Sequence, residues 1–93
     1  MTPEQVHMGK VAALGCALCA HKGFPNVPAC VHHILTGRTP GRRCSDWLTI
    51  PLCPMCHQDG QYSIHRLGQF KFDIHHGISE LGLLAWTLRR IYG

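Results

Sequence analysis

The sequence predicts a small α+β domain in which helices flank two short strands around a metal site made by four cysteines. Three observations carry this prediction. The chain has 93 residues, which suits one domain, 1–93, with only a modest core. Two CxxC pairs lie far apart and are brought together by a hairpin between them. Helical patterns stand at both ends of the chain.

The first element, residues 1–15, is predicted to be a helix. Thr2 can cap its start, and Gln5 completes a capping box with Thr2. Gly15 supplies the permissive backbone that the end of a helix needs. We expect His7, on this helix, to lie at the surface.

The central segment, residues 16–67, is predicted to form the metal-bound core. Residues 29–35 are apolar and β-compatible apart from two histidines, so they predict a short strand. A second short strand is predicted over residues 47–52. A helix is expected to follow the second CxxC pair and to end near Leu67, and residues 69–75 are able to continue it.

The last element, residues 79–92, is predicted to be a helix capped by Ser79. Leucine and isoleucine recur along it at spacings of three and four residues, which predicts one apolar face. The residues expected on that face are Leu81, Leu84, Leu88 and Ile91.

The two CxxC pairs predict a structural zinc site. Two residues between thiolates allow one turn to place both sulfurs on a tetrahedral metal, and four cysteines close the site to water. Disulfides and a thioredoxin-like redox pair are the alternatives, but no βαβ pattern surrounds either pair. Cys30 and Cys44 are interpreted as small buried hydrophobic residues. The four predicted zinc ligands are Cys16, Cys19, Cys53 and Cys56.

Charge and cysteine use indicate the class of protein. No secretory signal or membrane span is apparent, so we expect a reduced, cytoplasmic protein. The formal net charge is +4, which suits a polyanionic partner. A short segment broken by glycine and proline carries three arginines, whose planar forks match phosphate geometry. These predicted nucleic-acid contacts are Arg38, Arg42 and Arg43.

Four histidines form a second constellation around the zinc staple. His32 and His33 are adjacent on the first predicted strand, so their side chains point to opposite faces. One can therefore bind a metal while the other turns toward a substrate. His57 directly follows the second CxxC pair, and His65 lies eight residues further on. Each histidine alone is commonplace, but the combination indicates a functional site.

These motifs resemble those of HNH (ββα-metal, or His-Me finger) endonucleases of the subtype with a four-cysteine zinc. The order is CxxC, then Val-His-His-Ile at 31–34, then Pro-Leu-Cys-Pro-Met-Cys-His at 51–57, then Ser-Ile-His at 63–65. The run from 45 to 57 and the stretch from 72 to 86 resemble more closely the phage recombination-enhancement nucleases, which are Ref-like and RecA-dependent. The resemblance covers nearly all of the chain after the first helix.

The resemblance implies a metal-dependent DNA endonuclease linked to recombination or DNA processing, encoded by a phage or prophage. It implies that His33 is the general base and that His32, His57 and His65 bind a catalytic divalent metal such as Mg²⁺ or Mn²⁺. It further implies DNA as the substrate and a RecA filament as a partner, in a bacterial or phage-infected cell.

One position departs from the family pattern. HNH enzymes place an asparagine near the second strand to orient the base, whereas the only asparagine here is Asn26, outside that region. Asp46 is the nearest polar candidate. It either hydrogen-bonds His33 and fixes its tautomer, or serves only as a turn residue.

A non-catalytic zinc module that binds nucleic acid or a protein is the alternative function. It accounts for the cysteines and for the basic loop. It gives no reason to place His32 and His33 side by side on a strand next to that loop.

Overall fold

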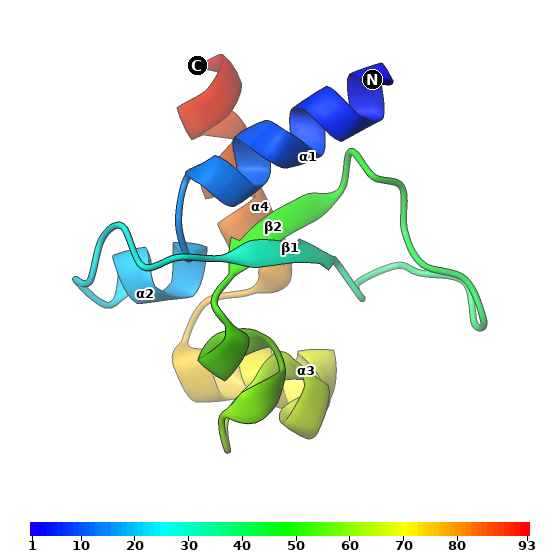
Figure 1. The fold of residues 1–93 in the computed structure, drawn as a ribbon. Helices are drawn as coiled ribbons and strands as arrows, with labels where there is room; N and C mark the ends of the chain where they lie inside the picture. Colours follow the sequence, from blue (N-terminus) through cyan, green and yellow to red (C-terminus); the bar gives the residue numbers. More distant parts are fainter.

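The computed structural model describes residues 1–93, in which helices surround a two-stranded antiparallel sheet (Figure 1). The small α+β class predicted from the sequence is confirmed. The elements, in order, are α1 (Pro3–Ala13), α2 (Ala17–His21), β1 (Cys30–His33), β2 (Thr49–Leu52), the π-helical turn η1 (Met55–Asp59), α3 (Ile64–His76) and α4 (Glu80–Tyr92).

The sheet is shorter than the sequence predicted at both strands. β1 and β2 pair with Cys30 opposite Leu52 and His33 opposite Thr49. A further bond from the amide of Ile34 to the carbonyl of Leu48 extends the ladder by one step, at 3.1 Å. Residues 45–48 form a turn instead of joining the strand. Two strands alone are marginal in water, so this sheet depends on what packs against it.

The alternation of β1 separates its two histidines, as expected for adjacent strand residues. His32 is 3% exposed and lies in the interior, opposite Ile50. His33 is partly exposed. β1 therefore places His32 in the interior and His33 near the solvent.

The two terminal helices meet over the sheet. Figure 1 shows α1 (blue) beside the C-terminal end of α4 (red), with both chain ends at the same end of the molecule. The capping box predicted for α1 is confirmed: the amide of Gln5 donates to Thr2 Oγ1 at 3.1 Å, and the amide of Thr2 donates to Gln5 Oε1 at 2.9 Å.

Two predictions about the terminal helices are wrong. His7 is not a surface residue but is 1% exposed. On α4, Leu81 is 53% exposed, and the buried side is rotated to include a glutamate and a threonine. The buried residues of α4 are Glu80, Leu83, Leu84 and Thr87. Periodicity located the helix but did not show which polar groups find partners inside.

Helix α3 is broken where the sequence suggested. Ser63 caps it by accepting a bond from the amide of Arg66 at 3.3 Å. Gly68 has φ 78° and ψ 162°, so a first helical piece ends close to Leu67 and a second piece runs on to His76. Only glycine adopts this backbone conformation without strain.

The hydrophobic core joins α2, the sheet, α3 and α4 in one cluster. Two of the six cysteines belong to it, which places the CxxC turns against the core. Its members are Cys16, Ala17, Leu18, Ile34, Ile50, Leu52, Cys53, Ile64, Phe72, Leu83 and Leu84.

Replacing Gly60 with alanine is expected to destabilise the protein by steric overlap. The new β carbon would collide with the carbonyl oxygen of Met55, which also accepts the amide of Gly60 at 3.0 Å. Overpacking costs about 1–3 kcal/mol, which corresponds to a loss of about 5–15 °C in Tm for a domain of this size. The measurement is thermal unfolding followed by circular dichroism.

Gly9→Ala is the matched control. Gly9 lies inside α1 with no atom within 4 Å of the added carbon, so alanine should leave Tm unchanged or raise it. If the Gly60→Ala variant and wild type have equal Tm values, the backbone around η1 accommodates the added carbon without strain, and the predicted overlap with Met55 is wrong.

Candidate metal and catalytic centre

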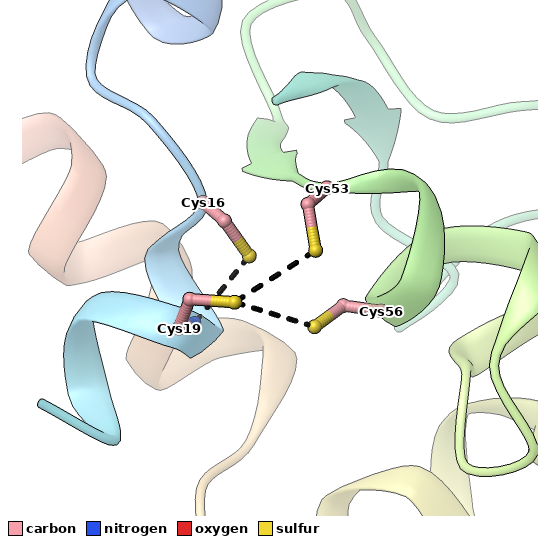
Figure 2. A group of neighbouring side chains, drawn as sticks. All are labelled: Cys16, Cys19, Cys53 and Cys56. Carbon is pink, nitrogen blue, oxygen red and sulfur yellow. Dashed lines mark hydrogen bonds between the residues drawn. The ribbon is translucent and has the colours of Figure 1, made fainter. Parts of the chain in front are cut away.

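The four cysteines of the CxxC pairs converge at one point (Figure 2). Cys16 caps α2 and Cys19 lies within it, whereas Cys53 directly follows β2 and Cys56 lies in η1. Cys19 Sγ lies 3.7 Å from Cys53 Sγ and 3.8 Å from Cys56 Sγ. All four sulfurs lie within 4.8 Å of one another. Sulfurs bound tetrahedrally at 2.3 Å from a zinc ion stand about 3.8 Å apart, so the spacing fits zinc.

The pKa shifts of three of the four cysteines also favour the binding of a cation at this site. Hydrogen bonding from Cys56 is the largest cause that lowers the pKa of Cys16 to about 5. Burial and the neighbouring Cys16 raise the pKa of Cys19 to about 12, and the bond to Cys16 raises the pKa of Cys56. The lowered pKa of Cys16 favours its thiolate form, and this negative charge opposes ionisation of the neighbouring thiols. A divalent cation relieves that repulsion, so the cluster can hold a metal ion such as zinc.

Three histidines form a second potential metal site. His32 comes from β1, His57 from η1 and His65 from α3, and one ring nitrogen of each lies within 4.8 Å of the others. Ring centroids of His57 and His65 are 4.6 Å apart, and those of His32 and His57 are 5.0 Å apart. Burial is the largest cause that lowers the pKa of His57 to about 4, with added repulsion from His32 and His65. A ring that stays neutral at pH 7 keeps a lone pair for a metal.

Glu80 supports His32 from behind, and sequence reasoning missed it. Its side chain is fully buried at the start of α4, and Oε2 lies 2.8 Å from His32 Nε2. The carboxylate also accepts the amides of Leu35 and Thr36 at 2.9 Å each and the Thr36 hydroxyl at 2.7 Å. Burial alone, the largest effect, raises the pKa of Glu80, but these bonds together outweigh it and lower the pKa. A glutamate after a helix cap is common, so nothing in the sequence singled it out.

The contact with Glu80 decides which nitrogen of His32 remains free. Nε2–H donates a hydrogen bond to the carboxylate, which leaves the free lone pair of the ring on Nδ1. A carboxylate behind a histidine in this way orients metal-binding imidazoles and raises their basicity. Glu80 therefore holds His32 in an orientation and tautomer that could bind a metal ion.

His33 meets Asp46 on the outer side of β1. His33 Nε2 lies 2.7 Å from Asp46 Oδ1, and the two side chains are 19% and 31% exposed. The Thr49 hydroxyl donates to the backbone carbonyl of Asp46 at 3.0 Å, which closes the turn that carries the aspartate. Asp46 thus stands within hydrogen-bonding distance of His33, and Nδ1 of His33 keeps its lone pair.

The basic segment lies away from these clusters. Arg38, Arg42 and Arg43 are all exposed on the long connection between β1 and β2, which projects from the body of the molecule in Figure 1. The structure holds two ion pairs, and neither involves these arginines. Their guanidinium groups are free to meet an anionic partner.

The two remaining cysteines differ from each other, and the prediction that both are buried is wrong. Cys30 is exposed, donates to the Leu52 carbonyl at 3.2 Å and lies 3.4 Å from His57 Nδ1. Cys44 is half-buried and packs at the edge of the core. Neither sulfur belongs to the four-cysteine cluster.

The chain matches a known protein family over most of its length. The family model described as "Recombination enhancement, RecA-dependent nuclease" matches residues 2–76. No curated protein matches the chain. None of the helices combines the length and apolar character needed to cross a bilayer.

Replacing Cys53 with serine is expected to remove bound metal and unfold the domain, because metal binding and folding are coupled. Cys44→Ser is the matched control, since Cys44 lies outside the cluster. The measurements are zinc per chain by elemental analysis and helix content by circular dichroism. A folded Cys53→Ser protein with no zinc would contradict the structural role of the cluster.

Replacing Glu80 with alanine is expected to lower the free energy of unfolding by about 2–3 kcal/mol, because it leaves His32 and two amides without their hydrogen bonds to a buried carboxylate. The pKa of Glu80 is lowered in the folded state, so its stabilisation is present at neutral pH and is lost as the pH falls through that lowered value. Urea unfolding of zinc-loaded protein at pH 7 measures the effect.

Glu4→Ala is the matched control, because Glu4 also lies in the first turn of a helix but makes no side-chain bond. Its loss should stay below about 1 kcal/mol. If both variants lose equally little, Glu80 does not anchor His32.

Proposed function

Because this chain belongs to the family of recombination-enhancement, RecA-dependent nucleases, we propose that it is a metal-dependent DNA endonuclease of the HNH type. The observation that carries the proposal is the pair of adjacent histidines on β1. His32 joins the three-histidine cluster on one face, and His33 joins Asp46 on the other. A zinc module without activity needs neither arrangement.

The proposed ββα-metal unit consists of β1, β2 and the helical segment formed by η1 and the first piece of α3, within residues 16–67 of a single nuclease domain spanning 1–93. η1 and α3 supply His57 and His65, while β1 supplies both adjacent histidines. The four-cysteine site fixes the junction of β2 with η1, because Cys53 and Cys56 flank it. We assign that site to a structural zinc.

His33 is the proposed general base. Its Nε2–H donates to Asp46, so the tautomer presents an unprotonated Nδ1 that can take a proton from water. Asp46 stabilises the imidazolium that results and keeps the ring oriented. It therefore fills the place of the asparagine that HNH enzymes use, as a positioning residue.

His32, His57 and His65 are the proposed ligands of the catalytic ion. When bound, a divalent ion there supplies Lewis acid stabilisation to the scissile phosphate and the leaving oxygen. The donor set is three imidazoles, and His32 is already oriented by Glu80. Nitrogen donors suit zinc and nickel better than Mg²⁺, which prefers oxygen ligands. We therefore rank late transition metals above Mg²⁺ and Mn²⁺ at this site.

Arg38, Arg42 and Arg43 are the proposed phosphate contacts. Their exposure and their freedom from ion pairs support this role. Contacts of this kind hold the backbone and carry no base sequence. The family description links these nucleases to RecA, so we propose that DNA within a RecA filament is the physiological substrate.

The proposed activity is tested by nicking of supercoiled plasmid with zinc-loaded protein. His33→Ala is expected to lower the rate constant by about 10²–10⁴-fold, because it removes the base. His21→Ala is the matched control, since His21 is exposed and outside both clusters. Each protein is assayed with Mg²⁺, Mn²⁺, Zn²⁺ or Ni²⁺, with and without a RecA filament.

Metal-dependent cutting that is lost in a folded His33→Ala variant supports the enzyme and its base. Plasmid binding by wild type without cutting under every condition would overturn the proposal and leave a non-catalytic zinc module. Equal rates for the His33→Ala and His21→Ala variants would remove His33 from the mechanism.

A further inference from the structure

His7 is a buried histidine that the proposed mechanism does not use. It lies on α1 and is 1% exposed. Its Nδ1 lies 2.6 Å from the hydroxyl of Tyr92, at the end of α4. Its Nε2 is the one buried side-chain nitrogen or oxygen in the structure without a hydrogen-bond partner. Burial is the largest cause that lowers the pKa of His7, and the nearby backbone of Trp47 partly opposes it.

An unpartnered buried nitrogen is unfavourable for stability. Leaving such a group without a partner costs about 1–3 kcal/mol, whereas an apolar ring of similar shape would fill the same space without that cost. Packing of α1 alone therefore does not account for a histidine here. The neighbours of the ring indicate what else it does.

The ring of His7 lies between two aromatic side chains. Tyr92 stacks on it with ring planes 9° apart and centroids 5.7 Å apart. Trp47 lies at 4.7 Å with its plane tilted by 38°. Lys10, one turn further along α1, places its Nζ 5.6 Å from the centre of the Tyr92 ring. His7 and Lys10 of α1 thus both contact Tyr92 at the end of α4, and His7 also contacts Trp47.

Trp47 directly follows Asp46, the partner of His33. The turn that carries both is held by short-range bonds, from the amide of Trp47 to Ser45 Oγ at 3.2 Å and from the Thr49 hydroxyl to the Asp46 carbonyl at 3.0 Å. These bonds shape the turn, and the bond from the amide of Ile34 to the carbonyl of Leu48 joins its end to β1. The Trp47 side chain, 42% exposed, rests on His7 and so joins the turn to α1 as well.

We propose that His7 is a positioning residue: through Trp47 it fixes the Asp46 carboxylate that holds His33. The inference rests on the proposed function, in which the Asp46–His33 pair orients the base. It assigns α1 and the end of α4 to the catalytic apparatus, although neither belongs to the ββα-metal unit. The bond between Tyr92 and His7 sets the angle of the ring under Trp47.

The test is a double-mutant cycle between His7 and Asp46, measured by single-turnover cleavage at saturating DNA. His7→Ala is expected to lower the turnover constant about tenfold with unchanged DNA affinity, as loss of an outer-shell partner does. In the Asp46→Asn background the same change should cause no further loss, because its effect passes through Asp46. Additive losses in the double variant would overturn the inference.

Two further variants separate positioning from folding. Tyr92→Phe keeps the aromatic ring and removes only the bond to His7, so it should cause a smaller loss of the same kind without unfolding. Val6→Ala is the matched control on the exposed side of α1 and should cut at the wild-type rate. A Tyr92→Phe protein that cuts like wild type, while His7→Ala unfolds, would reduce His7 to a core residue.

A readout independent of cleavage distinguishes failure of this inference from failure of the proposed function. In ¹⁵N NMR spectra of the zinc-loaded protein, the Nε2–H of His33 bonded to Asp46 should give a protected proton signal. Tyr92→Phe should weaken that signal, and Val6→Ala should leave it intact. An unchanged signal in the Tyr92→Phe variant would overturn the inference even if wild type cuts DNA, and a weakened signal supports it even if wild type does not.

Discussion

The convergence of four cysteine sulfurs is the constraint on which the other features depend. It joins the α2 segment to the junction of β2 with η1, two parts of the chain that are separated by more than thirty residues. A chain of 93 residues with a two-stranded sheet has little core to hold such a junction by packing alone. His57 follows Cys56 directly, so the geometry that brings the sulfurs together also sets where His57 stands relative to His32 on β1. A bound metal at the cysteines would therefore act on the histidine cluster through position, without taking part in chemistry there.

Because side chains alternate along β1, its two adjacent histidines lie in different environments. His32 points inward, where the buried carboxylate of Glu80 fixes its tautomer and ties β1 to α4. His33 points outward, where Asp46 fixes the tautomer in the same manner at the edge of solvent. Both pairs leave a Nδ1 lone pair available, and in the proposed mechanism the first binds a metal and the second takes a proton. A one-residue slip in register would exchange the two environments. The packing of both strands against the core and the turn at residues 45–48 hold the register in place.

Local features of the sequence predicted local features of the structure. The Thr2–Gln5 capping box, the break at Gly68 and the convergence of the CxxC pairs each depend on a few neighbouring residues, or on a metal-binding pattern with its own spacing. Features set by distant partners were missed. Glu80 is buried because amides from residues 35 and 36 meet it, and His7 is buried because Tyr92 and Trp47 enclose it. Cys30, at the start of β1, is exposed and lies outside the hydrophobic core. The pattern of residues within one helix or strand does not show which residues from distant parts of the chain will pack against it.

X-ray absorption at the zinc edge, on protein loaded with one equivalent of zinc, tests the central claim most directly. The account predicts a first shell of four sulfurs at about 2.3 Å and no nitrogen, because the closed cysteine site should take the first ion. The same spectrum should persist in a His57→Ala variant, which disrupts only the histidine cluster. A first shell containing imidazole nitrogen in the wild-type protein, or a shell of four sulfurs that persists after Cys16 and Cys53 are replaced together, would contradict this assignment, because the first zinc ion would then lie elsewhere.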